Sequence, residues 1–587
     1  MVSTLTWVLV GLAAYTLLAM GLEARGVLPE FVNVSGPITT IHTQKGKAAL
    51  TWLARPTRFW RAWGNLGVGA GLVVMAGSFL LVVFSALQSV ANPQPSALNE
   101  PRNALAIPGV NDFLPLSVAP EIVLGLGLGL VVHEGGHGLF CRVEDIGIES
   151  MGLAMLAILP VGAFVQPDEE ELLRADRGVQ TRMFAAGVTN NFALSFVALL
   201  LLFGPVAGSI AVVDGFHVGG SVEGTPAAEA GIGSGDVITG IDGRPVNDSA
   251  ELETALASAE GTSVEVRRRD GDPVTVRRAA VVSSAIRSAP LESGETVVSV
   301  NGTNVSTTSQ FTAAARDHPV ASLRTESGRT VRMPTGSYVL VAEDGPLDTA
   351  GAPTGAGVII TAIDGERTVN TTALGRVLGE RDPGETVSVT AYVDGQRTQY
   401  NATLTDNEAG GAVLGIAPEA GVSGIEINDF GINQYPAATF LGIIGGDTGG
   451  GATDLSFVRR MYFTFSLPLA GDAPGSPFEY NFPGFTGFWT DFYTVEGPLS
   501  LLGAPVVFTL ANALFWTAWI NLIIGQFNLI PTFPLDGGHI LRASTESVVS
   551  RLPVSARRSL TTAVTLTVTG SMILGLLAMV FGPRLFA

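Results

Sequence analysis

The chain has 587 residues, 47% of them hydrophobic and only 14% charged, with a mean hydropathy of +0.39. Soluble domains carry roughly a quarter charged residues, so this composition indicates a membrane protein. The net charge of −19 argues against a nucleic-acid partner, and the single cysteine, Cys141, excludes intramolecular disulfides and cysteine-rich zinc modules. The acidic surplus with very few lysines is typical of a halophilic, archaeon-like chain, although a generic acidic surface has the same signature.

Apolar stretches predict a polytopic α-helical membrane protein with about six transmembrane helices, because a spanning helix needs about 20 apolar residues. The expected spans are residues 3–22, 65–91, 116–141, 184–206, 498–523 and 560–582. Two shorter apolar pieces, 148–166 and 526–541, are interrupted by Gly and Pro. Such backbone is tolerated at membrane depth only where protein or a cavity satisfies it, so we expect re-entrant segments there.

Basic residues predict the orientation, because loops rich in Arg and Lys face the cytoplasm. They cluster after the first span, before the fourth and before the last, at Arg25, Lys45, Lys47, Arg55, Arg58, Arg61, Arg174, Arg177, Arg182, Arg551, Arg557 and Arg558. We therefore expect a multi-pass protein of the cell membrane whose polar insert, 207–497, is extracytoplasmic.

The insert contains an internal repeat at residues 235–243, 294–302 and 357–365. Each copy is an alternating apolar strand that ends in Asp-Gly or Asn-Gly, which favours a tight turn. This arrangement resembles PDZ domains of the α+β class. We expect a PDZ-like domain at 207–283, a degenerate repeat at 284–341 and another PDZ-like domain at 342–405. Such domains bind peptide ends at a sheet edge, or they only restrict access, and the sequence leaves both roles open.

The remaining boundaries follow from the spans. Residues 1–91 are expected to hold two helices and a cytoplasmic loop, and 92–206 the first part of a core. Residues 406–497, rich in Gly, Pro and aromatics, are expected at the membrane interface. The second part of the core is expected at 498–545, and a final helix at 546–587.

The strongest chemical signal is His133-Glu134-Gly135-Gly136-His137, inside an apolar run. Positions i and i+4 share a helix face, so both imidazoles can bind one zinc ion with the carboxylate of Glu134 beside it as general base. An acidic side chain at mid-membrane with no basic neighbour in the run is costly, and a divalent metal compensates it.

A second polar cluster interrupts apolar sequence between Asn528 and His539. Its prolines break a membrane helix, which allows Asp536 to be directed inward as a third ligand. Two His and one carboxylate form a sensible catalytic zinc set. His539 is a further ligand, an outer partner or part of a Gly-Gly turn, and the non-ligand interpretations are favoured.

The two motifs, in this order and on separate segments, resemble the site-2 protease family of intramembrane zinc metalloproteases. The resemblance implies one Zn²⁺ per chain on His133, His137 and Asp536, with Glu134 as base and Asn528 near the oxyanion. It also implies that a membrane hairpin, from Gly147 to Asp168, and Asn191 contact the substrate. The expected substrate is a membrane-anchored regulatory protein, cleaved in regulated intramembrane proteolysis.

Two other functions compete with this one. A non-enzymatic membrane adaptor would act through the PDZ-like domains alone, but the intact His, Glu and Asp residues count against it. Metal transport predicts several metal sites along a path, whereas the sequence offers one cluster.

Overall fold

The structure, a computed structural model, describes residues 4–29, 31–91, 93, 103, 107–111, 114–157, 159–407, 411–419, 421–446, 455–472, 479–553 and 556–585. Parts of the predicted regions 92–206 and 406–497 therefore lie outside the described residues. The chain forms two compact units. The core unit contains Met1–Ala211, Phe440–Gly487 and Val495–Ala587, and the insert unit contains Val212–Thr439 and Phe488–Thr494.

Within the described residues, five helices of the core unit are long and apolar enough to cross a membrane: Thr57–Ala91, Leu116–Val143, Arg177–Ser209, Ala504–Asn528 and Arg557–Leu585. They contain α3 (Thr57–Ala91), α4 (Ala119–Val143), α6 (Arg177–Leu201), α14 (Ala504–Asn528) and α16 (Arg557–Leu585). The span expected at 3–22 coincides with α1 (Thr4–Ala24), whose described apolar part, Val10–Ala24, is shorter. The structure thus agrees with the expected polytopic helical protein, whereas the expected number of six spans stays a prediction.

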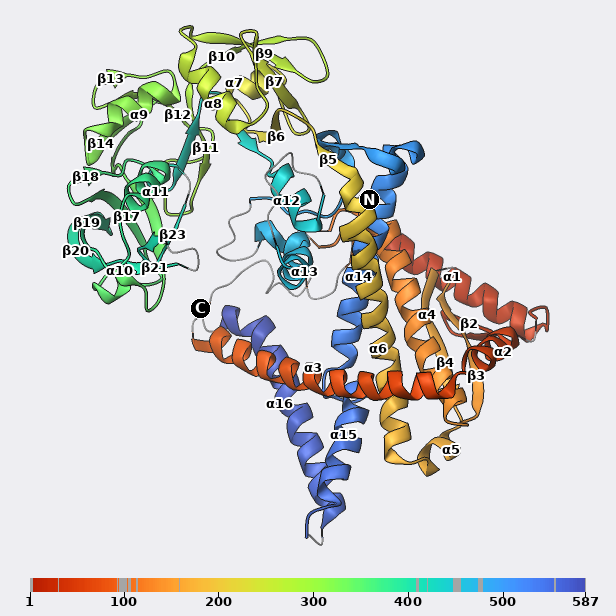
Figure 1. Cartoon of the computed structure of the whole chain (residues 1–587). Helices are drawn as coiled ribbons and strands as arrows, with labels where there is room; N and C mark the ends of the chain where they lie inside the picture. Colours follow the sequence, from red (N-terminus) through yellow and green to blue (C-terminus); the bar gives the residue numbers. More distant parts are fainter. Residues whose placement is uncertain are drawn as a thin grey trace. The chain divides into compact units, whose positions relative to one another are not determined.

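Helices α4, α6 and α14 lie side by side in the core unit (Figure 1). Small residues on α4 allow this close packing, as is common between membrane helices. A Cβ at Gly125 would lie 3.0 Å from the Trp516 carbonyl of α14, and one at Gly136 would lie 2.9 Å from the Ala186 carbonyl of α6. The three helices therefore form one tightly packed group.

The apolar piece expected to be re-entrant at 148–166 forms a hairpin of β3 (Ile148–Leu156) and β4 (Leu159–Pro167). Two strands not expected from the sequence, β1 (Val32–Ser35) and β2 (Ile38–His42), extend it into a sheet of order β1-β2-β3-β4. Helix α2 (Gln44–Leu53) follows β2 and packs on α4 and β3, and β4 packs along α4.

The second interrupted piece, 526–541, contains the end of α14, an irregular segment and the start of α15 (Asp536–Val549). Prolines 531 and 534 lie in the irregular segment, where their missing N–H groups leave no helical hydrogen bond unmade. Two shorter helices, α12 (Ala437–Ile444) and α13 (Phe457–Ser466), precede α14. This break in the helix places Asp536 at the first position of α15.

The insert unit contains three modules, each a sheet with one helix of at least two turns. The first has β6 (Phe216–Ser221), β7 (Val237–Ile241), β8 (Arg244–Pro245), β9 (Ser263–Arg268), β10 (Val274–Arg277) and α8 (Ser249–Ser258). The second has β11 (Ala280–Ala285), β12 (Thr296–Val300), β13 (Thr303–Asn304), β14 (Val320–Thr325), β15 (Thr330–Pro334) and α9 (Thr308–Arg316). The third has β16 (Ser337–Val341), β17 (Gly357–Ile363), β18 (Glu366–Arg367), β19 (Thr386–Val393), β20 (Gln396–Thr403) and α11 (Thr371–Gly379).

Each module receives its last strand from one returning segment. Strand β23 (Ile416–Pro418) pairs with β16, β24 (Ile425–Asn428) with β11, and β25 (Ile432–Gln434) with β6. The chain thus completes the third module first and the first module last, so the modules are nested. The middle repeat, expected to be degenerate, has the same strand order as its neighbours. Residues 416–434 belong to these sheets, although the sequence placed them within the interfacial region.

Candidate metal centre

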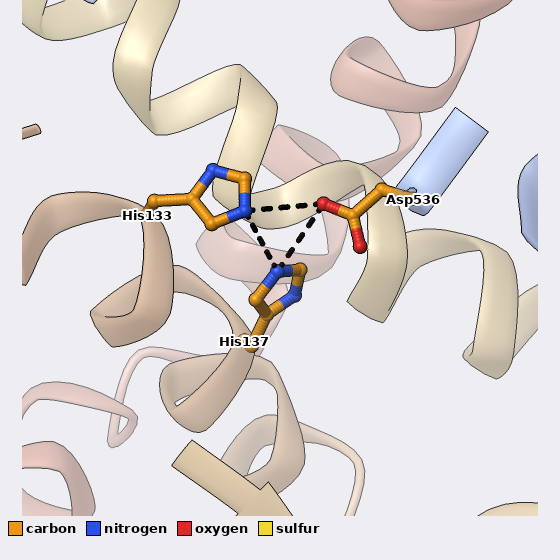
Figure 2. A group of neighbouring side chains, drawn as sticks. All are labelled: His133, His137 and Asp536. Carbon is orange, nitrogen blue, oxygen red and sulfur yellow. Dashed lines mark hydrogen bonds and ion pairs between the residues drawn. The ribbon is translucent and has the colours of Figure 1, made fainter. Parts of the chain in front are cut away.

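Helices α4 and α15 bring three potential metal ligands together, as Figure 2 shows. His133 and His137 lie one turn apart on α4, and Asp536 begins α15. The Asp536 Oδ2 atom lies 3.2 Å from His133 Nε2 and 3.3 Å from His137 Nε2. The two Nε2 atoms are themselves 3.2 Å apart. The three atoms therefore form a nearly equilateral triangle.

This triangle fits a tetrahedral zinc ion. Zinc binds imidazole nitrogen and carboxylate oxygen at about 2.0–2.2 Å, which separates tetrahedral ligand atoms by roughly 3.3–3.5 Å. Three protein ligands also leave the fourth position open, as in catalytic zinc sites. In addition, Asp536 Oδ2 is buried and accepts no hydrogen bond from the described part of the chain. A cation would compensate this buried charge.

A second contact fixes the tautomer of His137. Its Nδ1 lies 2.9 Å from the Met183 carbonyl oxygen of α6. Because a carbonyl only accepts, Nδ1 carries the hydrogen, and Nε2 of the neutral ring is left with a lone pair for a metal. The Nδ1 atom of His133 is buried and has no hydrogen-bond partner among the described residues.

Helix α6 approaches both imidazoles through Gly187. A Cβ at this position would lie 2.8 Å from His137 Nε2 and 2.9 Å from His133 Cε1. Real Cβ atoms essentially never approach other atoms this closely. The rings therefore occupy space that only a glycine leaves open.

Glu134, next to His133 on α4, contacts the hairpin through its carboxylate. Its Oε2 accepts a 3.0 Å hydrogen bond from the backbone N–H of Val165 on β4. The carboxylate also lines an apolar groove of about 370 Å³ between α2, α4 and the hairpin. Other groove residues include Leu50, Val131, Met151, Leu153, Ala163 and Phe164. Glu134 is thus a polar group at the wall of an apolar groove.

The other predicted site residues occupy different surroundings. The Nδ2 of Asn528, at the end of α14, donates to the Ile524 carbonyl at 3.0 Å, and no described hydrogen bond or ion pair joins Asn528 to the metal triangle. Asn191 is fully buried on α6. The ring of His539 stacks on Phe184 at 4.3 Å and meets Phe533 edge-on, so the structure places it among aromatic rings.

Sequence reasoning missed three parts of the site. They are the Met183 carbonyl, the Val165 amide and the space left by Gly187. The first two are backbone groups, which any residue type supplies, so no motif marks them. Gly187 lies in the run Ala186-Gly187-Val188, and its small residues were the only signal available.

Two histidines of an HExxH motif, the glutamate beside them and a converging aspartate, all on helices of an apolar core, are the set of residues typical of metallopeptidases. The chain belongs to peptidase family M50, whose family model matches residues 121–572. Our assignment to the site-2 protease family is confirmed. Because M50 peptidases are zinc enzymes, the family match agrees with our prediction of a bound zinc ion.

Two individual proteins and one solved structure are also similar to parts of this chain. A protein of Clostridium perfringens named as a zinc metalloprotease is 28% identical over 174 residues, which cover 25% of this chain and 50% of that protein. A membrane-bound transcription factor site-2 protease homolog of Arabidopsis thaliana is 29% identical over 207 residues, covering 33% and 37%. The matches thus span half or less of these relatives. The crystal structure of a PDZ domain from an SdrC-like protein of Listeria monocytogenes matches with 22% identity and a TM-score of 0.14, covering 15% of this chain and 90% of the domain.

Proposed function

We propose that this chain is an intramembrane zinc endopeptidase that cleaves a peptide bond in or near the transmembrane segment of a membrane-anchored protein. The observation that carries the proposal is the convergence of His133, His137 and Asp536 within 3.3 Å of one another. All three lie on helices of the apolar core unit, which supports hydrolysis at membrane depth.

His133, His137 and Asp536 would hold one zinc ion. When bound, zinc lowers the pKa of water toward neutrality and polarises a carbonyl oxygen. Glu134 accepts the proton of the attacking water at a carboxylate oxygen and returns it to the amide nitrogen that leaves. The carboxamide of Asn528 has a second N–H beside the one bound to Ile524, and this N–H is available to the developing oxyanion.

The apolar groove beside Glu134 is the proposed substrate site. A helical amide is shielded by its own hydrogen bonds, so the substrate must unwind before attack. The hairpin, closed where the Asp168 N–H donates to the Gly147 carbonyl at 2.9 Å, offers an extended backbone to such a segment. Asn191, being fully buried, is proposed to support α6 beside the site.

Basic residues support an orientation with the insert outside the cell membrane. A salt-bridged cluster at the end of α4, where Glu144 contacts Arg182 at 2.8 Å and Arg61 at 3.2 Å, would then be cytoplasmic. In this orientation we propose regulated intramembrane proteolysis, in which an earlier cut outside the membrane precedes cleavage here.

Purified protein and a single-span membrane reporter test the proposal. The wild-type chain should contain about one zinc per chain and cleave the reporter. Glu134→Gln should keep the metal and lose cleavage, whereas Asp536→Ala should lose both. His539→Phe keeps the aromatic stack and serves as the control that retains zinc. Persistent cleavage by Glu134→Gln would refute the assigned mechanism.

A further inference from the structure

The insert unit is rich in Asn-x-Ser/Thr sequences, which accept N-linked glycans when they lie on a surface outside the cytoplasm. Five of the eight asparagines of this unit begin such a sequence, against one of the twelve asparagines elsewhere in the chain. The single one in the core unit is Asn33, and the five in the insert are Asn247, Asn301, Asn304, Asn370 and Asn401. This uneven distribution follows the proposed orientation, in which the insert lies outside the cell membrane.

Each module has one of these acceptors in the stretch that joins its short strand to its helix. Asn247 directly precedes Asp248, the N-cap of α8. Asn304 lies three residues before Thr307, the N-cap of α9, and Asn370 is itself the N-cap of α11. A sequence copied with the repeat would keep one position relative to the helix. The acceptor thus recurs at the same place on each module without following from the repeat itself.

Four of the five acceptors in the insert are exposed, namely Asn247, Asn301, Asn304 and Asn401. Asn401 lies on β20, the edge strand of the third module. Its neighbours Tyr400 and Ala402 are buried, so the alternation along the strand directs Asn401 to the solvent. Asn370 is only half-exposed at its helix cap, and we leave it out of the set of acceptors.

The hydrogen bonds of the exposed acceptors are compatible with a glycan. A carboxamide has two hydrogens on Nδ2, and a glycan replaces one of them while Oδ1 and the second N–H stay in place. Asn301 Oδ1 accepts from the Ser322 N–H at 2.9 Å, and Asn247 Nδ2 donates to Glu251 Oε2 at 3.0 Å. Both contacts therefore survive the modification, and the folded module has no bond to give up.

We propose that every module of the insert carries an N-linked glycan. The acceptors are Asn247 in the first module, Asn301, Asn304 or both in the second, and Asn401 in the third. In this step Nδ2 attacks the anomeric carbon of an oligosaccharide that is linked through phosphate to a membrane lipid. The new N–C bond replaces the C–O bond to the phosphate, the lipid phosphate leaves, and one Nδ2 proton passes to a base. An oligosaccharide transferase of the same cell performs the step outside the cytoplasm.

Asn33 separates the effect of exposure from the effect of membrane side. It is exposed on β1, and its sequence Asn33-Val34-Ser35 is as complete as those of the insert. Its Nδ2 lies 3.1 Å from His42 Nε2, so one hydrogen bond is its only described side-chain contact of this kind. The segment after the first helix is rich in basic residues, which places it in the cytoplasm. Asn33 should therefore carry no glycan.

Glycopeptide mass spectrometry tests the proposal on the full-length chain, purified from the membranes of the cells that naturally produce it. Peptides that contain the acceptors of each module should carry the mass of a glycan, and the peptide that contains Asn33 should have its unmodified mass. A module without a glycan, or a glycan on Asn33, would overturn the proposal. The inference rests on the proposed orientation and not on proteolysis. Because the readout is a mass, its failure would leave the zinc site and the cleavage reaction unaffected.

Matched variants show whether the Asn-x-Ser/Thr sequence directs the modification. Thr403→Ala removes the exposed hydroxyl two residues after Asn401 and should abolish the glycan there. Thr403→Ser keeps a hydroxyl and should keep the glycan. Ser249→Ala and Ser249→Thr form the same pair for Asn247, and each change should leave the glycans of the other modules in place. A glycan that persists on Asn401 in Thr403→Ala, or is lost in Thr403→Ser, would also contradict the proposal.

Discussion

Gly187 decides whether α6 can pass close to the two imidazoles. Replacing it with Ala should push the rings of His133 and His137 apart, since a Cβ would lie within 3.0 Å of both. Disturbing the groups that orient metal ligands typically reduces affinity by about 10–100-fold. We expect a corresponding loss of zinc affinity, measured by competition with a chelating dye. Gly178→Ala on the same helix is the control, because its Cβ would make only an ordinary 3.5 Å contact. Equal zinc affinity of Gly187→Ala and Gly178→Ala would contradict the role assigned to Gly187.

Val165 acts through its backbone N–H, which orients Glu134 at 3.0 Å. Val165→Pro removes this donor, and Pro is tolerated on edge strands where the N–H points away from the sheet. We expect zinc content to be unchanged and kcat to fall about tenfold, since a misoriented base transfers protons poorly. Val165→Ala keeps the N–H and should keep most of the activity. An active Val165→Pro enzyme would show that Glu134 needs no support from the hairpin.

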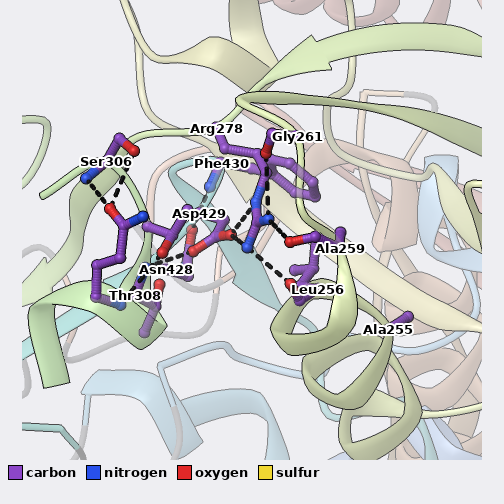
Figure 3. A network of polar contacts seen from close by, with 12 residues as sticks. Ala255, Leu256, Ala259, Gly261, Arg278, Ser306, Thr308, Asn428, Asp429 and Phe430 are labelled. Carbon is purple, nitrogen blue, oxygen red and sulfur yellow. Dashed lines mark hydrogen bonds and ion pairs between the residues drawn. The ribbon is translucent and has the colours of Figure 1, made fainter. Parts of the chain in front are cut away.

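At the scale of elements, a buried ion pair joins the first and second modules within the insert unit. Arg278 contacts Asp429 at 2.5 Å, and both side chains are almost completely buried. Arg278 also donates to carbonyls at the end of α8, and the other oxygen of Asp429 accepts from Thr308 N–H at the start of α9 (Figure 3). The returning segment thus holds both modules at one point.

Removing either side chain of the Arg278–Asp429 pair should therefore destabilise the insert unit strongly. Asp429→Leu leaves a buried guanidinium unpaired, which costs about 3–5 kcal/mol. Hydrogen exchange should become faster in α8 and α9. The double variant Arg278→Met/Asp429→Leu should lose less than the sum of the single changes, since no buried charge remains unpaired. Arg329→Met breaks a more exposed pair with Glu295 and should have a much smaller effect. If the losses of stability caused by Arg278→Met and Asp429→Leu simply add in the double variant, the two side chains are not coupled and the prediction is wrong.

Elements differ in how far the sequence predicts them. The long helices follow from apolar runs, and the first two ligands follow from one helix turn, His133 to His137. The returning strands β23, β24 and β25 have three or four residues each, too short for a periodic pattern to identify. They pair with strands far earlier in the chain, such as Ile432 with Ser221. Local propensity contains no information about such long-range pairing.

At the scale of the whole molecule, the metal triangle links two segments that the insert separates in sequence. His133 and His137 precede the insert, and Asp536 follows it. The family match likewise begins before the insert and ends after it. The core is therefore assembled from both ends of the chain, and a bound ion would stabilise only the conformation in which α4 and α15 meet.

Zinc should consequently raise the stability of the core unit by linkage. A ligand at 100 times its Kd contributes about 2.7 kcal/mol when it binds only the folded state. In detergent, we expect added zinc to raise the Tm of the metal-depleted protein, and a chelator to reverse the shift. Mg²⁺ should have little effect, because it prefers oxygen ligands in an octahedral arrangement to imidazole nitrogen. Asp536→Ala removes the ligand that joins α15 to α4, so its Tm should not respond to zinc. If that variant responds as strongly as the wild-type chain, zinc stabilises the protein elsewhere, and the two segments are held together by packing alone.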